Sequence, residues 1–474
     1  MMHVIEIIPT ERKKLYDLHS NKLETAYNLN RKAVSFQANK SEPVYNWFKY
    51  KEGFSSTLVK YFIEKYSSKP GIILDPFAGV GTTLFAGQEL GWQTYGVELL
   101  PVGVFVMNTR EATKGVDVEE LKKIGKSIWK DLSKIDKHDI HINHIPITRD
   151  AFPEDTEIYL NKYLTYCSRI KDKKIQTILR FAAFAILEGI SYTRKDGQYL
   201  RWDYRSKRAL PGKPFNKGKI VAFEAALKNK LNQIIFDLLP DSLCLLFDRF
   251  DDNKHGKYPI NIIQGSCLEE LPKLEDEFFD FIVTSPPYCN RYDYTRTYAL
   301  ELVFWGCDSE RVRDLRQTML SCTVENKEKI EYLNKFYSSI GRTDTFDSVL
   351  KAYHNSKAMT EINTVLNELN KQGKINNNNI PRMVKNYFLE MCFVIYEMSR
   401  VIRQGGYCVM VNDNVRYGGE EIPVDLILSG FAEKFGFKVN KIFVLPKGKG
   451  NSSQQMGNYG RTEIRKCVYL WQKN

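Results

Sequence analysis

The stretch GIILDPFAGVGTT, residues 71–83, predicts the centre of the fold. It begins with an apolar run typical of a short buried strand, ends that strand at Asp75 and continues into a glycine-rich turn. A helix is expected to start near Thr82, and the run Gln93–Val97 predicts a second strand that ends in Glu98. Strand, helix and strand in this order form a βαβ unit, with an acidic residue at the carboxyl end of each strand.

The glycine-rich turn suits a nucleoside that carries no phosphate. Its glycines let a ligand approach the backbone, and the N-terminus of the following helix offers free N–H groups. Glu98 is placed to accept hydrogen bonds from a ribose diol. Leu84 stands where a dinucleotide-binding turn has its last glycine, and the Gly-Lys-Ser/Thr of phosphate-binding loops is missing. Because Asp75 and Glu98 would repel phosphate, a cationic cofactor is favoured over a purely structural turn.

A second motif, TSPPY at residues 284–288, directly follows the apolar run 278–283, which is typical of a buried strand. Its prolines donate no backbone hydrogen bond, so they end the strand and stiffen the turn. Ser285 and Tyr288 are thereby held at the carboxyl end of a strand, where open α/β sheets bind ligands. A hydroxyl, a carbonyl and an aromatic ring suit a flat molecule with an amino group. The alternative is a proline turn that only caps a core strand.

Composition limits the class of protein. A chain of 474 residues exceeds one simple core, so two or three domains are expected, and the net charge of +12 favours a polyanionic partner. The nine cysteines form no Cys-x-x-Cys pair, which argues against zinc and disulfides and suits a reducing cytoplasm. No signal peptide and no membrane span are expected. His138, His141 and His144 recur without a cysteine or carboxylate to complete a metal site, so a solvated loop is predicted there and no metal.

The stretch from Ser191 to Ile220 is basic and rich in aromatic residues. Nine lysines and arginines stand against two aspartates in it. Such side chains neutralise phosphates, and arginine can bind guanine through two hydrogen bonds in a major groove. The alternative is a solvated basic loop. The residues predicted to bind nucleic acid are Arg194, Lys195, Arg201, Trp202, Arg205, Lys207 and Arg208.

The two motifs together resemble the amino-group methyltransferases that modify DNA bases with S-adenosylmethionine, the N4-cytosine and N6-adenine family. Residues 75–83 resemble the cofactor loop of that family, 50–63 the segment before it, and 284–288 the catalytic tetrad with its leading residue. The resemblance covers roughly 50–110, 260–300 and 385–474. It implies an α/β fold: a Rossmann-like class I methyltransferase sheet, mixed but mostly parallel, with helices on both faces and two largely helical inserts.

The resemblance also implies roles for single residues. The hydroxyl of Ser285 and the carbonyl of Pro286 would accept the N–H bonds of the target amine, Tyr288 would stack on the base, and the base would be flipped out of the duplex. Pro287 completes the tetrad. Ser266 stands where the family often has an aspartate. The implied contacts of S-adenosylmethionine are Phe54, Ser55, Asp75, Pro76, Phe77, Ala78, Gly79, Gly81, Thr82, Thr83, Glu98 and Ser266.

A tetrad led by serine resembles the enzymes that modify cytosine N4, whereas one led by aspartate is commoner for adenine N6. We therefore predict a cytosine-N4 methyltransferase of a restriction-modification system. Its expected partners are double-stranded DNA and a cognate endonuclease, and its expected place is the prokaryotic cytoplasm, at the nucleoid. Carbon-5 methylation would need a cysteine after a proline, but Cys289 follows Tyr288. The alternatives are an adenine-N6 enzyme, an RNA guanine-N2 methyltransferase and an inactive DNA-binding protein.

The motif order predicts how the chain is divided. A helical extension comes first, the cofactor-binding and catalytic halves of the methyltransferase domain are separated by a target-recognition insert, and a second helical insert precedes the last part of the sheet. The expected boundaries, in that order, are 1–45, 46–110, 111–255, 256–306, 307–380 and 381–474.

Overall fold

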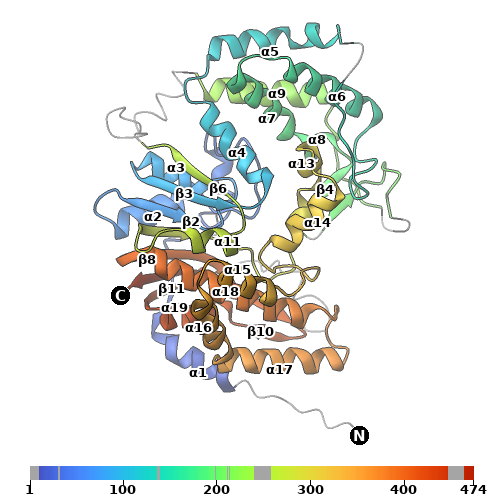
Figure 1. Ribbon diagram of the computed structural model, residues 1–474. Helices are drawn as coiled ribbons and strands as arrows, with labels where there is room; N and C mark the ends of the chain where they lie inside the picture. The colour runs from blue at the N-terminus through green and yellow to red at the C-terminus, as the bar shows by residue number, and fades with distance from the viewer. Residues whose placement is uncertain are drawn as a thin grey trace.

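The computed structural model describes residues 10–29, 32–135, 139–197, 199–210, 212, 214–239, 258–446 and 464–474. Its centre is one large sheet with the strand order β1-β11-β12-β8-β7-β2-β3-β6 (Figure 1). The strands are β1 (Leu23–Thr25), β2 (Ile72–Asp75), β3 (Gln93–Glu98), β6 (Ile260–Gln264), β7 (Phe279–Thr284), β8 (Ile402–Asp413), β11 (Phe437–Val444) and β12 (Lys466–Lys473).

The sheet is mixed and mostly parallel, as predicted. Strands β6, β3, β2, β7 and β8 run parallel to one another, and β1 runs parallel to β11. Strand β12 lies between β8 and β11 and is antiparallel to both. The sheet grows in both directions from β2: β3 and then β6 lie on one side of it, and β7 and then β8 on the other. Ligands of open α/β sheets bind at such a switch point, beyond the carboxyl ends of the strands. The fold is that of a Rossmann-like methyltransferase.

Helices cover both faces of this sheet because alternate side chains of its strands point to opposite sides. On one face, Ile73 and Phe281 pack with the apolar side of α2 (Ser56–Tyr66). On the other face, Leu74 and Ile282 belong to the large core built around α18 and α19. The remaining helices that flank the sheet are α3 (Thr82–Glu89), α4 (Pro101–Ala112), α11 (Cys267–Glu270), α18 (Ile380–Val401) and α19 (Val424–Lys434).

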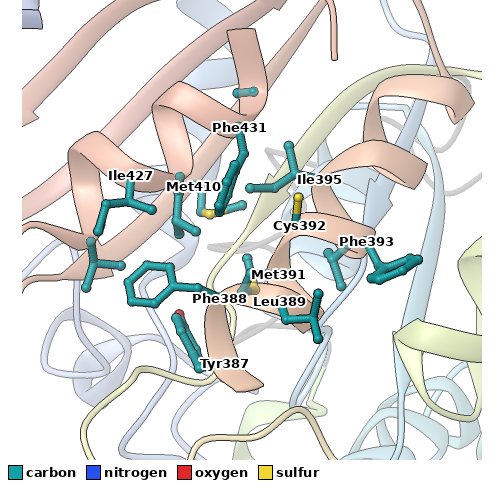
Figure 2. Packing of buried hydrophobic residues seen from close by; sticks show 14 of the residues in the cluster. Tyr387, Phe388, Leu389, Met391, Cys392, Phe393, Ile395, Met410, Ile427 and Phe431 are labelled. Carbon is teal, nitrogen blue, oxygen red and sulfur yellow. The ribbon is translucent and has the colours of Figure 1, made fainter. Parts of the chain in front are cut away.

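Helix α18 is largely buried because it packs between the sheet and other helices. Figure 2 shows Phe388 and Cys392 of this helix packed near Met410 of β8 and Phe431 of α19. Its outer side is covered by the helices of the second insert, so side chains such as Phe393 are buried as well. Those helices are α15 (Ile330–Ser339), α16 (Thr343–His354) and α17 (Lys357–Lys371).

The first insert forms a helical layer at the end of the molecule away from β8 and β11 (Figure 1). Its core joins the sheet domain through α4, where Phe105 packs on Phe184 at 5.1 Å between ring centroids. A two-stranded hairpin, β4 with β5, follows the helices. The elements are α5 (Val118–Leu132), α6 (Glu154–Ser168), α7 (Lys173–Phe184), α8 (Leu187–Ile190), β4 (Thr193–Lys195), β5 (Leu200–Trp202) and α9 (Phe223–Asp237).

Three short regions complete the chain. The segment after the catalytic motif forms α12 (Tyr294–Thr297), α13 (Ala299–Phe304) and α14 (Ser309–Thr318), and a hairpin of β9 (Val415–Tyr417) and β10 (Glu420–Ile422) follows β8. The N-terminal extension contains helix α1 (Thr10–His19), but it also adds β1 to the sheet edge beside β11, where helices alone were predicted. A three-residue strand has too few side chains to show an alternating pattern. None of the helices in the described part of the chain is long and apolar enough to cross a membrane.

Candidate active site

The two sequence motifs meet at the carboxyl ends of β2 and β7. These strands are hydrogen-bonded neighbours, with Leu74 opposite Ile282. One step further on, the Thr284 hydroxyl donates a hydrogen bond of 2.7 Å to Asp75 Oδ1. Asp75 Oδ1 also accepts the Phe77 N–H at 3.0 Å, which folds the glycine-rich turn back on the strand. The cofactor turn and the serine that follows Thr284 are therefore fixed to each other.

Both motifs open on one cavity of about 750 Å³, part of it continuous with solvent. The predicted site residues on its wall are Phe54, Asp75, Pro76, Phe77, Ala78, Gly79, Thr82, Glu98, Ser266, Ser285 and Pro287.

The other predicted site residues in the two motifs do not line this cavity, and they support the turns that do. Ser55 caps helix α2 by accepting the Leu58 N–H at 3.4 Å, and its hydroxyl donates to the Ala33 carbonyl at 2.7 Å. The Thr83 hydroxyl donates to the Val283 carbonyl at 3.2 Å. Gly81, Pro286 and Tyr288 are likewise absent from the cavity wall.

Glu98 closes the glycine-rich turn from the neighbouring strand. Its Oε2 accepts the Gly79 N–H at 2.8 Å, and its Oε1 accepts the Leu100 N–H at 2.7 Å. Each carboxylate oxygen has a second lone pair, so the expected bonds to a ribose remain available. Burial raises the pKa of Glu98 to about 7, although both N–H donors act to lower it. Burial likewise raises the pKa of Asp75 to about 6 against the hydrogen bond from Thr284.

Glu52 is a third carboxyl group on the cavity wall, and the sequence reasoning missed it. It accepts hydrogen bonds from the hydroxyls of Tyr298, at 2.6 Å, and Tyr292. Burial raises the pKa of Glu52 to about 7. The sequence feature that could have indicated Glu52 is its position in the segment 50–63, where it is the one acidic residue and directly precedes Gly53 and Phe54. Tyr294, six residues after the TSPPY motif, also lines the cavity, as do Met319 and Leu320 from the segment that follows α14. No local sequence pattern distinguishes these three residues.

The charge of the cavity fits a cation. Asp75, Glu98 and Glu52 supply three carboxyl groups, and none of the described residues on the wall is basic. The ionised carboxylates would repel a phosphate, whereas they would attract a sulfonium or ammonium group. The residues present therefore fit S-adenosylmethionine, with the carboxylates and the N–H groups of the turn as its polar contacts.

The glycine-rich turn packs so closely on helix α4 that the helix needs a glycine at its point of contact. Gly79 has a φ of +54°, in the left-handed region that favours glycine, and its carbonyl points at Gly103 of α4. A Cβ added to Gly103 would lie 2.2 Å from the Gly79 oxygen, far inside contact distance. The close approach of turn and helix therefore depends on two glycines, Gly79 in the turn and Gly103 in α4.

We predict that Gly103→Ala destabilises the protein by about 1–3 kcal/mol through this clash, although glycine to alanine in a helix ordinarily stabilises by roughly 0.5–1 kcal/mol. Thermal unfolding measures the change. Gly125→Ala in helix α5 is the matched control, since its new Cβ would lie at an ordinary 3.5 Å from Ile235. Equal and favourable effects of the two substitutions would show that the turn moves aside freely.

The serine of the catalytic motif is accessible from the cavity, whereas the cysteine that follows the motif is buried. Ser285 is half-buried on the cavity wall, and its hydroxyl has no hydrogen-bond partner among the described residues. Cys289 is completely buried, burial raises the pKa of its thiol, and it does not line the cavity. A cysteine nucleophile at this position would have no access to a substrate.

The predicted nucleic-acid segment forms the hairpin β4–β5 and the loop after it. Arg194 and Arg201 are exposed cross-strand partners, with both guanidinium groups over the Phe215 ring at 5.3 and 4.1 Å. Lys207 is exposed, and Arg208 stacks on Trp202 at 4.6 Å.

Two residues of this segment are already paired within the protein. Lys195 is buried, and its ammonium group contacts Glu301 at 2.5 Å, which leaves no surface for a phosphate. The sequence did not reveal this, because the partner of Lys195 lies far along the chain. Arg205 bonds to the buried carboxylate of Asp203 at 2.6 and 3.0 Å, although it remains exposed.

Among the histidines of the first insert, His144 contacts two polar side chains of the same insert. His144 Nε2 lies 3.2 Å from Glu157, and its Nδ1 lies 3.1 Å from the Thr148 hydroxyl. His138 is outside the described residues. No group of three or more metal-binding side chains is found in the described part of the chain.

Fold and cavity together define a methyltransferase with a site for S-adenosylmethionine. A family model of DNA methylases matches residues 8–102. The chain is 44% identical to Type II methyltransferase M.AvaI of Nostoc sp. over 99% of its own length and 94% of that protein, and the Anabaena variabilis protein of the same name gives the same values. It is 41% identical to Type II methyltransferase M.BsoBI of Geobacillus stearothermophilus over 98% and 92% of the two chains. No solved structure matches significantly.

The chain therefore belongs to the Type II DNA methyltransferases of the N4/N6 amino-methyltransferase family, which act in restriction-modification and use S-adenosylmethionine as methyl donor.

Proposed function

We propose that this protein methylates the exocyclic N4 of cytosine in double-stranded DNA, at a base flipped out of the duplex. The observation that carries the proposal is the free hydroxyl of Ser285 on the wall of the acidic cavity, one residue after the Thr284–Asp75 hydrogen bond. A neutral serine occupies the first position of the tetrad, where enzymes that modify adenine N6 more often have an aspartate.

The proposed chemistry uses the hydrogen-bond acceptors of the turn. An exocyclic amine is a poor nucleophile because its lone pair is delocalised into the ring. The Ser285 hydroxyl and the Pro286 carbonyl accept its two N–H bonds, which draws the nitrogen toward tetrahedral geometry and frees the lone pair. S-adenosylmethionine supplies the methyl group on a sulfonium that the cavity carboxylates favour. The new N–C bond would form as the C–S bond of the sulfonium breaks, which leaves a neutral thioether, and the methylated nitrogen would then lose one N–H proton to water. Holding amine and methyl carbon in line provides much of the acceleration.

The proline of this turn has a further role in substrate specificity. Pro286 has no backbone N–H, so its backbone offers the amine an acceptor, the carbonyl, and no donor. A substrate keto oxygen would find no donor at the Pro286 carbonyl and would be disfavoured there, whereas an amino group can donate to it. Tyr288, half-buried beside the turn, is proposed to stack on the flipped base.

The DNA-binding surface is proposed to include the exposed basic residues of the hairpin region. Arg194 and Arg201 are like charges directly opposite each other, an arrangement that costs stability in an isolated hairpin. A phosphate between the two strands would offset that cost. Trp202, Arg205, Lys207 and Arg208 extend the same surface. A cognate restriction endonuclease that recognises the same sequence is proposed as the genetic partner.

The base is identified by mass spectrometry of nucleosides from duplex DNA treated with the protein and labelled S-adenosylmethionine. N4-methylcytosine is the expected product. N6-methyladenine would overturn the cytosine assignment and keep the amino-methyltransferase, and label on transfer RNA guanine alone would overturn the DNA substrate. Sequencing of modified bases in cells that express the chain then reports the recognition site.

A further inference from the structure

A second hollow of the surface lies between the hairpin β4–β5 and helix α14, outside the cofactor cavity. It is open to solvent, with a volume of about 880 Å³ that includes part of this open space, and is lined by eleven residues, among them three arginines and no acidic residue. Tyr199 and Trp202 come from the hairpin, and Arg313 and Arg316 from α14. We call it the arginine groove. Figure 1 shows α14 beside β4, between the helical layer of the first insert and the sheet domain.

The arginines at the base of the groove share one buried carboxylate. Asp293 lies 3.3 Å from Arg296 and 3.2 Å from Arg316, and its side chain is 3% exposed. Arg296 also contacts the Glu325 carboxylate at the surface, at 3.2 Å. Besides this ion pair, Arg316 Nε donates a hydrogen bond to the Thr295 hydroxyl, at 2.9 Å. These contacts hold the planes of the two guanidinium groups in place, so they are pre-organised for an anion.

Arg313 is the least constrained of the three arginines. Its side chain is 65% exposed, and its nearest carboxylate, Glu310, is 3.5 Å away and itself 75% exposed. An exposed pair of this kind contributes little free energy, so the guanidinium can exchange it for a phosphate.

The opposite wall of the groove supplies aromatic rings. Tyr199 is 49% exposed, which is high for a large aromatic side chain on a formed hairpin. Trp202 is half-buried under the guanidinium of Arg208, at 4.6 Å. Arginines facing partly exposed aromatic rings are typical of surfaces that contact nucleic acid, where rings pack on sugars or bases while guanidinium groups bind phosphates.

The groove is linked mechanically to the catalytic turn. Asp293, which holds its arginines, follows the TSPPY motif in the same segment, and its N–H donates to the Gly197 carbonyl at the tip of the hairpin, at 3.0 Å. A ligand in the groove therefore touches both the target-recognition insert and the segment that leaves the active site. The first and second inserts meet here.

We propose that the arginine groove binds the phosphodiester backbone of the substrate DNA next to the flipped nucleotide, with Arg313 as a direct phosphate contact. The proposal rests on the proposed function and adds to it: α14, in the second insert, becomes part of the DNA-binding surface. A backbone contact fits better than base readout because all the charged groups on the wall are guanidinium groups, which suit phosphate oxygens.

The test compares Arg313→Ala with Arg311→Ala. Both arginines are on α14 and both are exposed, but only Arg313 lines the groove. The full-length variants are titrated with a cognate and a scrambled duplex over a range of salt concentrations. Loss of one phosphate contact should weaken binding about tenfold and reduce the salt dependence, the slope of log K against log salt, by about 1. Arg311→Ala should leave both quantities close to those of the unmodified protein.

The outcomes separate this inference from the proposed function. A loss for Arg313→Ala on both duplexes, with the reduced slope, supports the backbone contact. Equal behaviour of the two variants, with normal methylation by the unmodified protein, overturns the groove and leaves the methyltransferase intact. A loss confined to the cognate duplex assigns Arg313 to base recognition and overturns the backbone contact. If the unmodified protein methylates no duplex DNA, the proposed function itself fails.

Discussion

Replacing Ser285 with alanine is expected to lower kcat for methyl transfer by about 10²–10³-fold, the usual cost of removing one aligned hydrogen-bonding group from an active site. The affinity for S-adenosylmethionine should change little, because the cavity wall is built from many other residues and only one hydroxyl is lost. Single-turnover transfer of a labelled methyl group to duplex DNA measures the rate, and equilibrium binding measures the affinity.

Cys289→Ser is the control for this experiment. Cys289 lies in the same turn, but it is buried and away from the cavity, so the substitution should preserve the rate. A Ser285→Ala variant that retained full activity would contradict the proposed role of the hydroxyl and leave the Pro286 carbonyl as the acceptor. A slow Cys289→Ser variant with a normal fold would contradict the conclusion that the thiol is inert.

The pattern of the sequence was sufficient for the parts of the fold that local chemistry determines. The strand that ends at Asp75, the glycine-rich turn and the helix from Thr82 are each encoded by adjacent residues, and the structure has them at the predicted places. The proline pair ended β7 as predicted. Since parallel strands place their carboxyl ends at one edge, the sequence also predicted that Asp75 and Ser285 would lie at that edge of the sheet, and both line the same cavity.

The rest depends on contacts between distant parts of the chain. Lys195 is indistinguishable in the sequence from its exposed basic neighbours, and only the approach of Glu301 makes it a buried ion pair. Glu52 becomes a carboxyl group of the site because Tyr292 and Tyr298 donate hydrogen bonds to it from beyond the catalytic motif. The short strand β1 exists only because β11 offers it a free edge. Periodicity and composition carry no information on such partners.

Cofactor affinity is expected to rise with pH across the range in which the cavity carboxyl groups ionise. Burial sets the pKa of Asp75 at about 6 and those of Glu98 and Glu52 at about 7, so at pH 6 the glutamic acids are mostly protonated. A sulfonium cofactor favours their ionised forms and must displace protons to bind. Affinity should increase by up to about tenfold per pH unit for each group that titrates, and level off above about pH 8.

The stability of the protein without cofactor should change in the opposite direction. The folded pKa of Glu98 and Glu52, about 7, exceeds the ordinary value of 4.5, so between these limits the folded state binds more protons than the unfolded state. The free energy of unfolding therefore falls as pH rises through this window and is constant above it. Isothermal titration of S-adenosylmethionine in buffers of different ionisation enthalpy measures the released protons, and denaturant unfolding measures the stability.

Glu52→Gln separates the contribution of one group. The amide cannot ionise, so the pH dependence of cofactor affinity should become shallower, and fewer protons should be released on binding. Glu98 would still titrate. An affinity that does not vary between pH 5.5 and 8 would contradict the raised pKa values and mean that water reaches the cavity and keeps its carboxylates ionised. In that case the acidic wall would attract the cofactor equally across this pH range, and burial would not control the ionisation of the carboxyl groups.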